Sequence, residues 1–132
     1  MNLYPCPCCG YQVFSEAAGS YDICPICFWE DDLVQLVFPD MGGGANYFSL
    51  ISSQSSFNLH RACEERFIEN VRHPEITDIR DPLWRSLNPK KDRFLSESRP
   101  EDGQKWQSTK FEDISDKLYY WRPDFWLDTN GP

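Results

Sequence analysis

Five cysteines near the start of the chain have a spacing that suits a single metal ion: Cys6, Cys8, Cys9, Cys24 and Cys27. They form two Cys-x2-Cys pairs in the pattern C-x2-C-x14-C-x2-C, close to the spacing of known zinc sites. Two residues between ligands form a tight turn that directs both thiolates at one ion, and the segment between the pairs can bring the second turn opposite the first. We therefore predict one Zn²⁺ bound by Cys6, Cys9, Cys24 and Cys27.

A centre with four sulfur ligands would be structural rather than catalytic. Four thiolates at about 2.3 Å close a tetrahedron around zinc and leave no position for water. Structural zinc contributes on the order of 10–16 kcal/mol of apparent binding free energy, against roughly 5–15 kcal/mol for the stability of a typical domain. Gly10 directly follows the first pair and permits the positive φ that such a turn needs. We expect the N-terminal lobe to depend on the ion.

Other roles for the cysteines remain open. The Cys-x2-Cys thiols could instead form disulfides, or act as a redox switch that releases zinc on oxidation. The N-terminal sequence has no secretory signal, which disfavours disulfides and points to the cytoplasm. Cys8 either stays free beside the metal or replaces Cys6 or Cys9 as a ligand. Cys63 lies on the apolar face of a predicted helix, where a buried core thiol is expected.

The elements expected around these cysteines are short. Strand-like runs cover 11–14 and 21–23, which suggests a hairpin, and the apolar run 33–38 predicts a third strand. Three consecutive glycines mark a loop over 39–44. Helices are predicted from Asn46 or Ser49 to about Leu59, and over 61–72, where the apolar residues recur on one face. Residues 75–105 are loop-like, and 106–127 are strand-like or form short helices.

These elements indicate an α+β fold in a single domain spanning residues 1–132. It has a small N-terminal β-hairpin lobe resembling a zinc ribbon, then two helices and an aromatic-rich C-terminal segment. Residues 1–74 would form the zinc-binding region, and 75–132 an extension packed on it. No apolar run approaches the roughly 18 residues that span a bilayer, so no membrane contact is expected.

The chain is acidic, and the charge is uneven. Its 132 residues include 13 Lys and Arg against 21 Asp and Glu, a net charge of −8. The first 60 residues hold six carboxylates and no Lys or Arg, which gives −6. Such a surface repels phosphate, so nucleic acid is an unlikely ligand and a basic protein is the favoured partner.

Two groups of residues are candidates for contact with that partner. Glu30, Asp31 and Asp32 form an acidic triplet directly after Cys27-Phe28-Trp29. Such carboxylates could instead bind a hard cation or do acid–base work, and a triplet of this kind is also typical of a solvated or helix-capping turn. The C-terminal candidates are Trp121, Asp124 and Trp126, because Trp is enriched at interface hot spots; the alternative is that these aromatics fill the core. No catalytic motif is present, so the chain is not expected to be an enzyme.

Three stretches together resemble the bacterial cysteine-rich CPCC domain family: YPCPCCGYQVF, then GSYDICPICFWEDD, then GGAN with SL three residues later. The resemblance covers about residues 4–73, and 62–74 is similar to the family's second helix, whereas SQSSF at 53–57 departs from its pattern. It implies a small module of zinc-ribbon type, and some members are similar to immunity proteins of polymorphic toxin systems. The expected function is therefore binding and neutralising a toxin domain with a basic surface; the alternatives are a zinc-ribbon adaptor or regulator, or a thiol redox switch.

Overall fold

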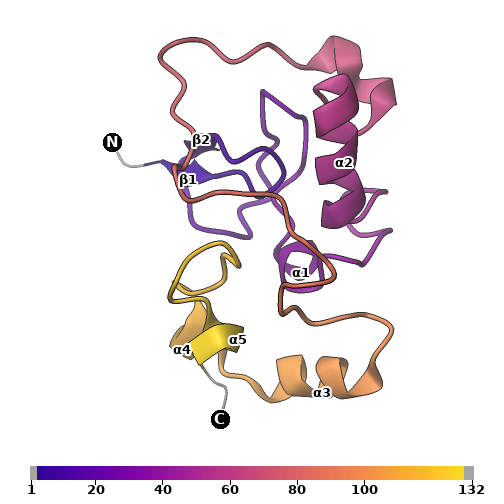
Figure 1. Cartoon of the computed structure of the whole chain (residues 1–132), viewed down its shortest axis with the longest axis vertical. Coiled ribbons are helices and arrows are strands. Elements are labelled where there is room, and N and C mark those ends of the chain that lie inside the picture. Colours follow the sequence, from indigo (N-terminus) through magenta and orange to yellow (C-terminus); the bar gives the residue numbers. More distant parts are fainter. Residues whose placement is uncertain (1–2, 130–132) are drawn as a thin grey trace.

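A two-stranded antiparallel sheet at the N-terminus is followed by helices, in an α+β arrangement (Figure 1). The computed structural model describes residues 3–129. The elements in chain order are β1 (Tyr4–Pro5), β2 (Gln12–Phe14), α1 (Leu33–Val37), α2 (Leu50–His60), the 3₁₀ helix η1 (Glu65–Asn70), α3 (Pro100–Ser108), α4 (Phe111–Ile114) and α5 (Trp126–Thr129). Within the described part of the chain, no helix is both long and apolar enough to cross a membrane.

The N-terminal hairpin pairs different segments from those predicted. β2 lies against β1, with Tyr4 opposite Phe14, and the expected strand over 21–23 is absent apart from a single bridge between Ile23 and Glu30. The cause is the first cysteine turn, which reverses the chain within six residues and brings β2 back onto β1 before residue 21 is reached.

The predicted strand over 33–38 is wrong, because these residues form the helix α1. Short apolar runs fit a strand or a buried helix equally well, and local capping decides between them. Here Asp32 is the N-cap: its Oδ1 accepts hydrogen bonds from the backbone N–H groups of Val34 (2.9 Å) and Gln35 (3.3 Å). The cap satisfies two of the free N–H groups that any helix start leaves.

The first predicted helix is confirmed as α2, capped by Ser49, whose Oγ accepts from Ser52 N at 3.1 Å. The second, over 61–72, is instead the short 3₁₀ helix η1 within a more irregular stretch. α2 ends at Arg61, which has a left-handed φ of 63°. Beyond it, Cys63 N donates to Cys27 O at 2.7 Å, so the chain is held against the second cysteine turn rather than continuing as an α-helix.

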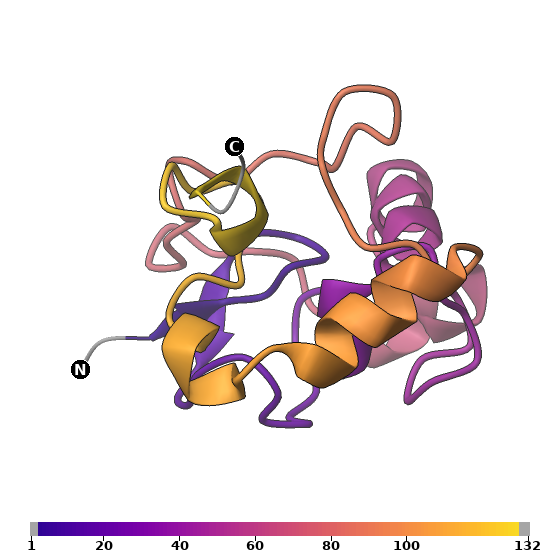
Figure 2. The ribbon, with the colours of Figure 1, turned by 90° about the horizontal axis from the view of Figure 1, so that it is seen from below.

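Part of the predicted C-terminal loop is helical. α3 begins at Pro100, inside the stretch expected to be a loop, and Glu101 and Asp102 follow in its first turn. Proline at the first helical position followed by acidic residues is a standard helix-start signal, which the sequence did contain. Residues 106–127 contain the end of α3, all of α4 and the start of α5, joined by turns rather than strands. Figure 1 and Figure 2 both show α4 on the same side of the molecule as the sheet.

The C-terminal extension is tied to the first cysteine turn through Asp81, whose side chain is 4% exposed. Its backbone N–H donates to Gly10 O (2.8 Å), and its Oδ2 accepts from Trp121 Nε1 (3.0 Å) and Arg122 Nη2 (2.6 Å). Burial would raise the pKa of Asp81, but the bonds from Trp121, the Leu83 N–H and Arg122 outweigh it and hold that pKa below its ordinary value. Its stabilising effect is therefore present at neutral pH and is lost as the pH falls below about 4.

Replacing Asp81 should weaken this connection. We expect Asp81→Asn to lower the free energy of unfolding at pH 7 by about 1.5–3 kcal/mol, because a buried, charge-assisted set of hydrogen bonds is lost. Urea unfolding, followed by Trp fluorescence, measures the change. The matched control is Asp113→Asn on the exposed face of α4, which should change it by less than about 0.5 kcal/mol. Equal effects of the two substitutions would contradict the role of Asp81.

Candidate metal centre

The first cysteine turn is closed by two backbone hydrogen bonds. Gly10 N donates to Cys6 O at 2.7 Å, and Cys6 N donates to Tyr11 O at 2.9 Å. Gly10 has a φ of 83°, as the sequence predicted. A side chain at this position would also collide with the C-terminal extension, because a Cβ would lie 2.6 Å from Cδ2 of Trp84. Glycine is therefore required both by the backbone and by the packing.

The second cysteine turn repeats this hydrogen-bond pattern. Phe28 N donates to Cys24 O at 2.8 Å, and Cys24 N donates to Trp29 O at 2.9 Å. Phe28 takes the place of Gly10, with a left-handed φ of 71° that costs a non-glycine residue about 1 kcal/mol. Its ring packs against Phe67 at a centroid distance of 4.6 Å, which offsets part of that cost. The two turns thus present their cysteines in the same way.

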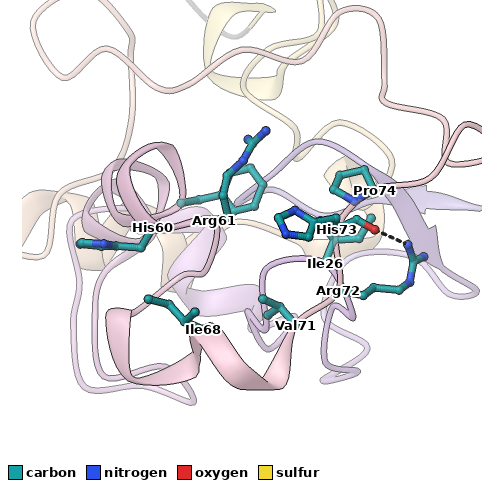
Figure 3. A pocket seen from close by; sticks show the side chains of 9 residues that line it. Ile26, His60, Arg61, Ile68, Val71, Arg72, His73 and Pro74 are labelled. Atoms are coloured by element: carbon teal, nitrogen blue, oxygen red, sulfur yellow. Dashed lines mark hydrogen bonds between the residues drawn. The ribbon is translucent and has the colours of Figure 1, made fainter.

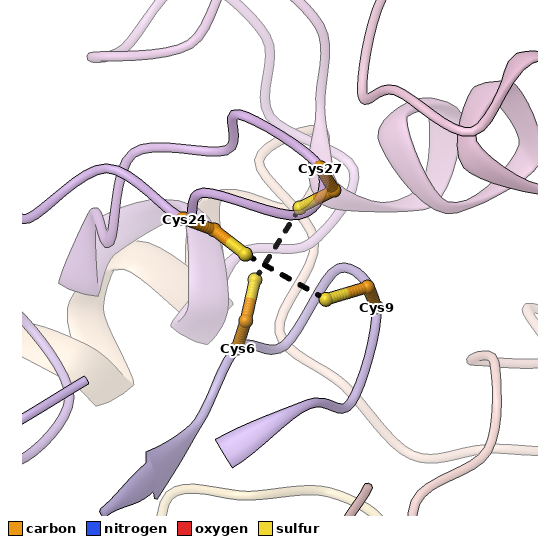
Figure 4. A group of neighbouring side chains, drawn as sticks. All are labelled: Cys6, Cys9, Cys24 and Cys27. Carbon is orange, nitrogen blue, oxygen red and sulfur yellow. Dashed lines mark hydrogen bonds between the residues drawn. The ribbon is translucent and has the colours of Figure 1, made fainter. Parts of the chain in front are cut away.

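The two turns bring four sulfur atoms together: those of Cys6, Cys9, Cys24 and Cys27 (Figure 4). Cys6 Sγ lies 3.6 Å from Cys27 Sγ, Cys9 Sγ lies 3.7 Å from Cys24 Sγ, and all four lie within 4.8 Å of one another. A tetrahedron with metal–sulfur bonds of about 2.3 Å has edges of about 3.8 Å, so the arrangement fits a tetrahedral ion. Disulfide bonds need about 2.05 Å, and all six cysteines are free thiols here.

The electrostatics of the centre also suit a cation. All four sulfur-bearing residues are fully buried. Burial raises the pKa values of Cys6 and Cys27 well above the ordinary thiol value. Burial would also raise the pKa of Cys24, but hydrogen bonds from Cys27, Cys6 and Cys9 outweigh it and hold that pKa well below the usual range. Four buried thiolates need a compensating positive charge, and a bound dication supplies it while releasing protons.

The two remaining cysteines lie beside the centre but outside the group of four. Cys8 and Cys63 are both fully buried, and burial raises the pKa of each thiol. Cys63 is held through its backbone, by the bond from its N–H to Cys27 O. The expectation that Cys63 is a buried thiol is confirmed.

The carbonyl groups of the first turn are held by residues far along the chain. Pro7 O accepts from Gln54 Nε2 (3.0 Å) and from Trp84 Nε1 (2.9 Å), and Cys9 O accepts from Arg80 Nε (2.8 Å). Gln54 lies in the SQSSF stretch of α2. Sequence reasoning missed these supporting residues because no local pattern marks them.

Two residues of the acidic triplet are buried and accept hydrogen bonds inside the protein. Asp31 is 1% exposed, its Oδ2 accepts from Ser20 Oγ at 2.8 Å, and burial raises its pKa. Asp32 is 5% exposed, and its Oδ2 accepts from Ala45 N at 2.9 Å in addition to capping α1. Glu30 is half-buried. Two of the three carboxylates proposed as partner contacts are therefore turned inward, because they satisfy backbone N–H groups.

Asp32 also shapes the glycine-rich loop. A Cβ on Gly44 would lie 2.7 Å from Asp32 Oδ2. The loop therefore lies so close to this carboxylate that only glycine fits at position 44. Gln35, on α1, is fully buried and holds the same loop: its Nε2 donates to the carbonyls of Met41 and Asn46, both at 3.0 Å. The GGGAN stretch is thus a structural loop packed on α1.

The aromatic candidates at the C-terminus belong to the core. Trp121 is 6% exposed and Trp126 is 2% exposed, and both join the buried cluster that includes the cysteines. Asp124 is exposed. Of the six residues predicted to contact a partner, only Asp124 presents a fully exposed side chain, because this short chain uses its large aromatics to fill its interior.

Metal binding should depend on the four clustered cysteines but not on Cys8. Native mass spectrometry of protein grown with zinc should find one ion per chain in the wild type and in the matched control Cys8→Ser. Cys9→Ser should lose the ion, together with most of the roughly 10–16 kcal/mol that zinc contributes, so the variant should unfold. Retention of zinc by Cys9→Ser with loss in Cys8→Ser would assign the ligands differently.

The chain matches the family described as Cysteine-rich CPCC over residues 4–78, more than half of its length. No curated protein matches it. The match spans both cysteine turns, the glycine-rich loop, α2 and η1, and ends within the first residues of the 75–132 extension. The chain belongs to the cysteine-rich CPCC family.

Proposed function

We propose that this protein is a zinc-stabilised protein-binding module of zinc-ribbon type, and that it neutralises a basic toxin domain in the cytoplasm, as an immunity protein does. The observation that carries the binding role is an apolar groove between the start of the chain and the C-terminal extension. The zinc would be structural: Cys6, Cys9, Cys24 and Cys27 would hold it and would keep the two turns in place.

The groove has the size and composition of a binding surface. It encloses about 470 Å³. Leu3, Tyr4 and Phe111 line it with side chains that are 38%, 40% and 41% exposed. Exposed apolar side chains grouped around one hollow mark sites for protein partners, because each loses water-exposed area on binding.

The charge around the groove favours a basic partner. Asp116 lines it, and the exposed carboxylates of Glu16, Glu112 and Asp113 lie close to lining residues in the sequence. Arg122 also lines the groove but is paired with Asp81, and Lys110 and Lys117 offset part of the negative charge. The net charge of −8 adds a long-range field that speeds encounter with a positively charged protein. Apolar contacts in the groove would then slow dissociation.

A protein-binding role fits the four-cysteine centre better than a catalytic or redox role does. Four sulfur ligands around one ion leave no open coordination position for substrate or water. A thiol redox switch needs an accessible thiolate, whereas all six cysteines are fully buried. A zinc-ribbon adaptor for nucleic acid conflicts with the acidic surface, which repels phosphate.

Co-expression with the product of the neighbouring gene tests this proposal. Native mass spectrometry should find a one-to-one complex that carries one zinc ion, and its dissociation constant should lie well below about 1 μM. Phe111→Lys should weaken binding at least about tenfold, because it places a positive charge in the groove facing a basic partner.

The matched control is Ile76→Lys, which makes the same change at a fully exposed apolar residue outside the groove. It should leave affinity within about twofold and should leave the melting temperature unchanged. Equal weakening by both variants, or no complex tighter than about 1 μM, would count against the proposal.

A further inference from the structure

A second cavity lies on the other cysteine turn, between the end of α2 and the segment after η1 (Figure 3). It encloses about 110 Å³, and Ile26, Phe57, Ile68 and Val71 contribute apolar side chains. This volume suits one small apolar group, since a buried cavity of about 150 Å³ accommodates benzene.

The polar part of this cavity is basic. His60, Arg61, Arg72 and His73 line it, and none of its nine lining residues carries a carboxylate. In a chain with a net charge of −8 this is an unusual grouping, because it places both histidines of the protein beside two arginines. An anion is therefore the complementary ligand.

Arg61 is the cation available to that ligand. Arg72 is occupied, since its guanidinium makes a two-pronged ion pair with Asp78 at 2.7 and 2.9 Å. Within residues 3–129, the Arg61 guanidinium makes no hydrogen bond or ion pair, and it lies 5.4 Å from the Phe57 ring centroid at the edge of the cavity. Figure 3 shows the His73 ring on the same side, with Ile68 and Val71 opposite.

The backbone at Arg61 provides a second, independent observation. This residue ends α2 in the left-handed conformation, with a φ of 63°. Helix ends of this kind usually carry glycine, because any other side chain is strained there. Arg61 keeps its guanidinium over the cavity at that conformational cost.

We propose that this cavity binds a carboxylate carried on a small apolar group, with the apolar part between Phe57, Ile68 and Val71 and the carboxylate on Arg61 and His73. A planar guanidinium matches a carboxylate through two parallel hydrogen bonds. The ligand has two sources, a free branched-chain acid or the C-terminal residue of a peptide. The proposal does not depend on the groove or on the toxin partner.

Two probes of nearly equal shape test the site. N-acetyl-L-leucine carries a carboxylate, whereas N-acetyl-L-leucinamide is neutral. Titration of each into the zinc-loaded protein, followed in ¹H–¹⁵N spectra, should shift the signals of Ile68, Val71 and His73 with the acid. The amide should bind at least about tenfold more weakly. Equal binding of acid and amide, or shifts only elsewhere, would overturn the proposal.

Variants of Arg61 separate binding from folding. Arg61→Gly relieves the left-handed backbone, so its melting temperature should be equal to or above that of the wild type, while affinity for N-acetyl-L-leucine falls at least about tenfold. Arg93→Gln removes the same charge from an exposed arginine outside the cavity and should leave affinity within about twofold. Retained affinity in a folded Arg61→Gly would overturn the proposal.

The same titration distinguishes a free branched-chain acid from a peptide C-terminus as the natural ligand. If a pentapeptide ending in leucine with a free carboxylate binds more tightly than isovalerate, the natural ligand is a peptide C-terminus. If isovalerate binds at least as tightly as the peptide, it is a free acid. Either result supports the carboxylate site, whereas binding of neither probe overturns it.

Discussion

The clustering of four buried sulfur atoms, in a group that could hold one metal ion, is the constraint on which the rest of the structure depends. Holding Cys6, Cys9, Cys24 and Cys27 within 4.8 Å of one another requires two matching turns with left-handed residues at Gly10 and Phe28. These short turns leave backbone carbonyls pointing outward in a buried region, and buried carbonyls need donors. Residues of α2, of the stretch around η1 and of the C-terminal extension supply those donors. The two cysteine turns therefore organise segments that are remote in sequence.

The donors come from two different parts of the chain. Gln54, Arg80 and Trp84 bind carbonyls of the first turn, so α2 and the C-terminal extension both pack onto it. The backbone N–H groups of Cys63 and Arg72 bind carbonyls of the second turn. A chain with so little regular sheet depends on such side-chain and loop contacts, because its backbone groups cannot satisfy one another in long ladders.

The groove and the cavity differ in the charge at their edges. The groove beside β1 and α4 is apolar with carboxylates nearby, whereas the cavity beneath Arg61 is apolar with a basic edge. The cavity includes Ile26 of the second cysteine turn, and the groove includes Pro5, next to the first, so one metal centre would help to fix both surfaces. Two acidic residues predicted to contact a partner are instead turned inward: Asp31 holds Ser20, and Asp32 positions α1 and the glycine-rich loop.

The sequence by itself determined which four cysteines meet and to which family the chain belongs, because both depend on the short-range spacing of the two Cys-x2-Cys turns. It also determined α2, whose Ser49 cap is a local signal. Tertiary structure decided the rest. The run over 33–38 became helical through Asp32, the pairing of β2 followed from the first turn, and the predicted interface tryptophans became core. Burial and hydrogen-bond partners are properties of the whole fold, so residues such as Gln54 and Asp81 carry no local signal of their roles.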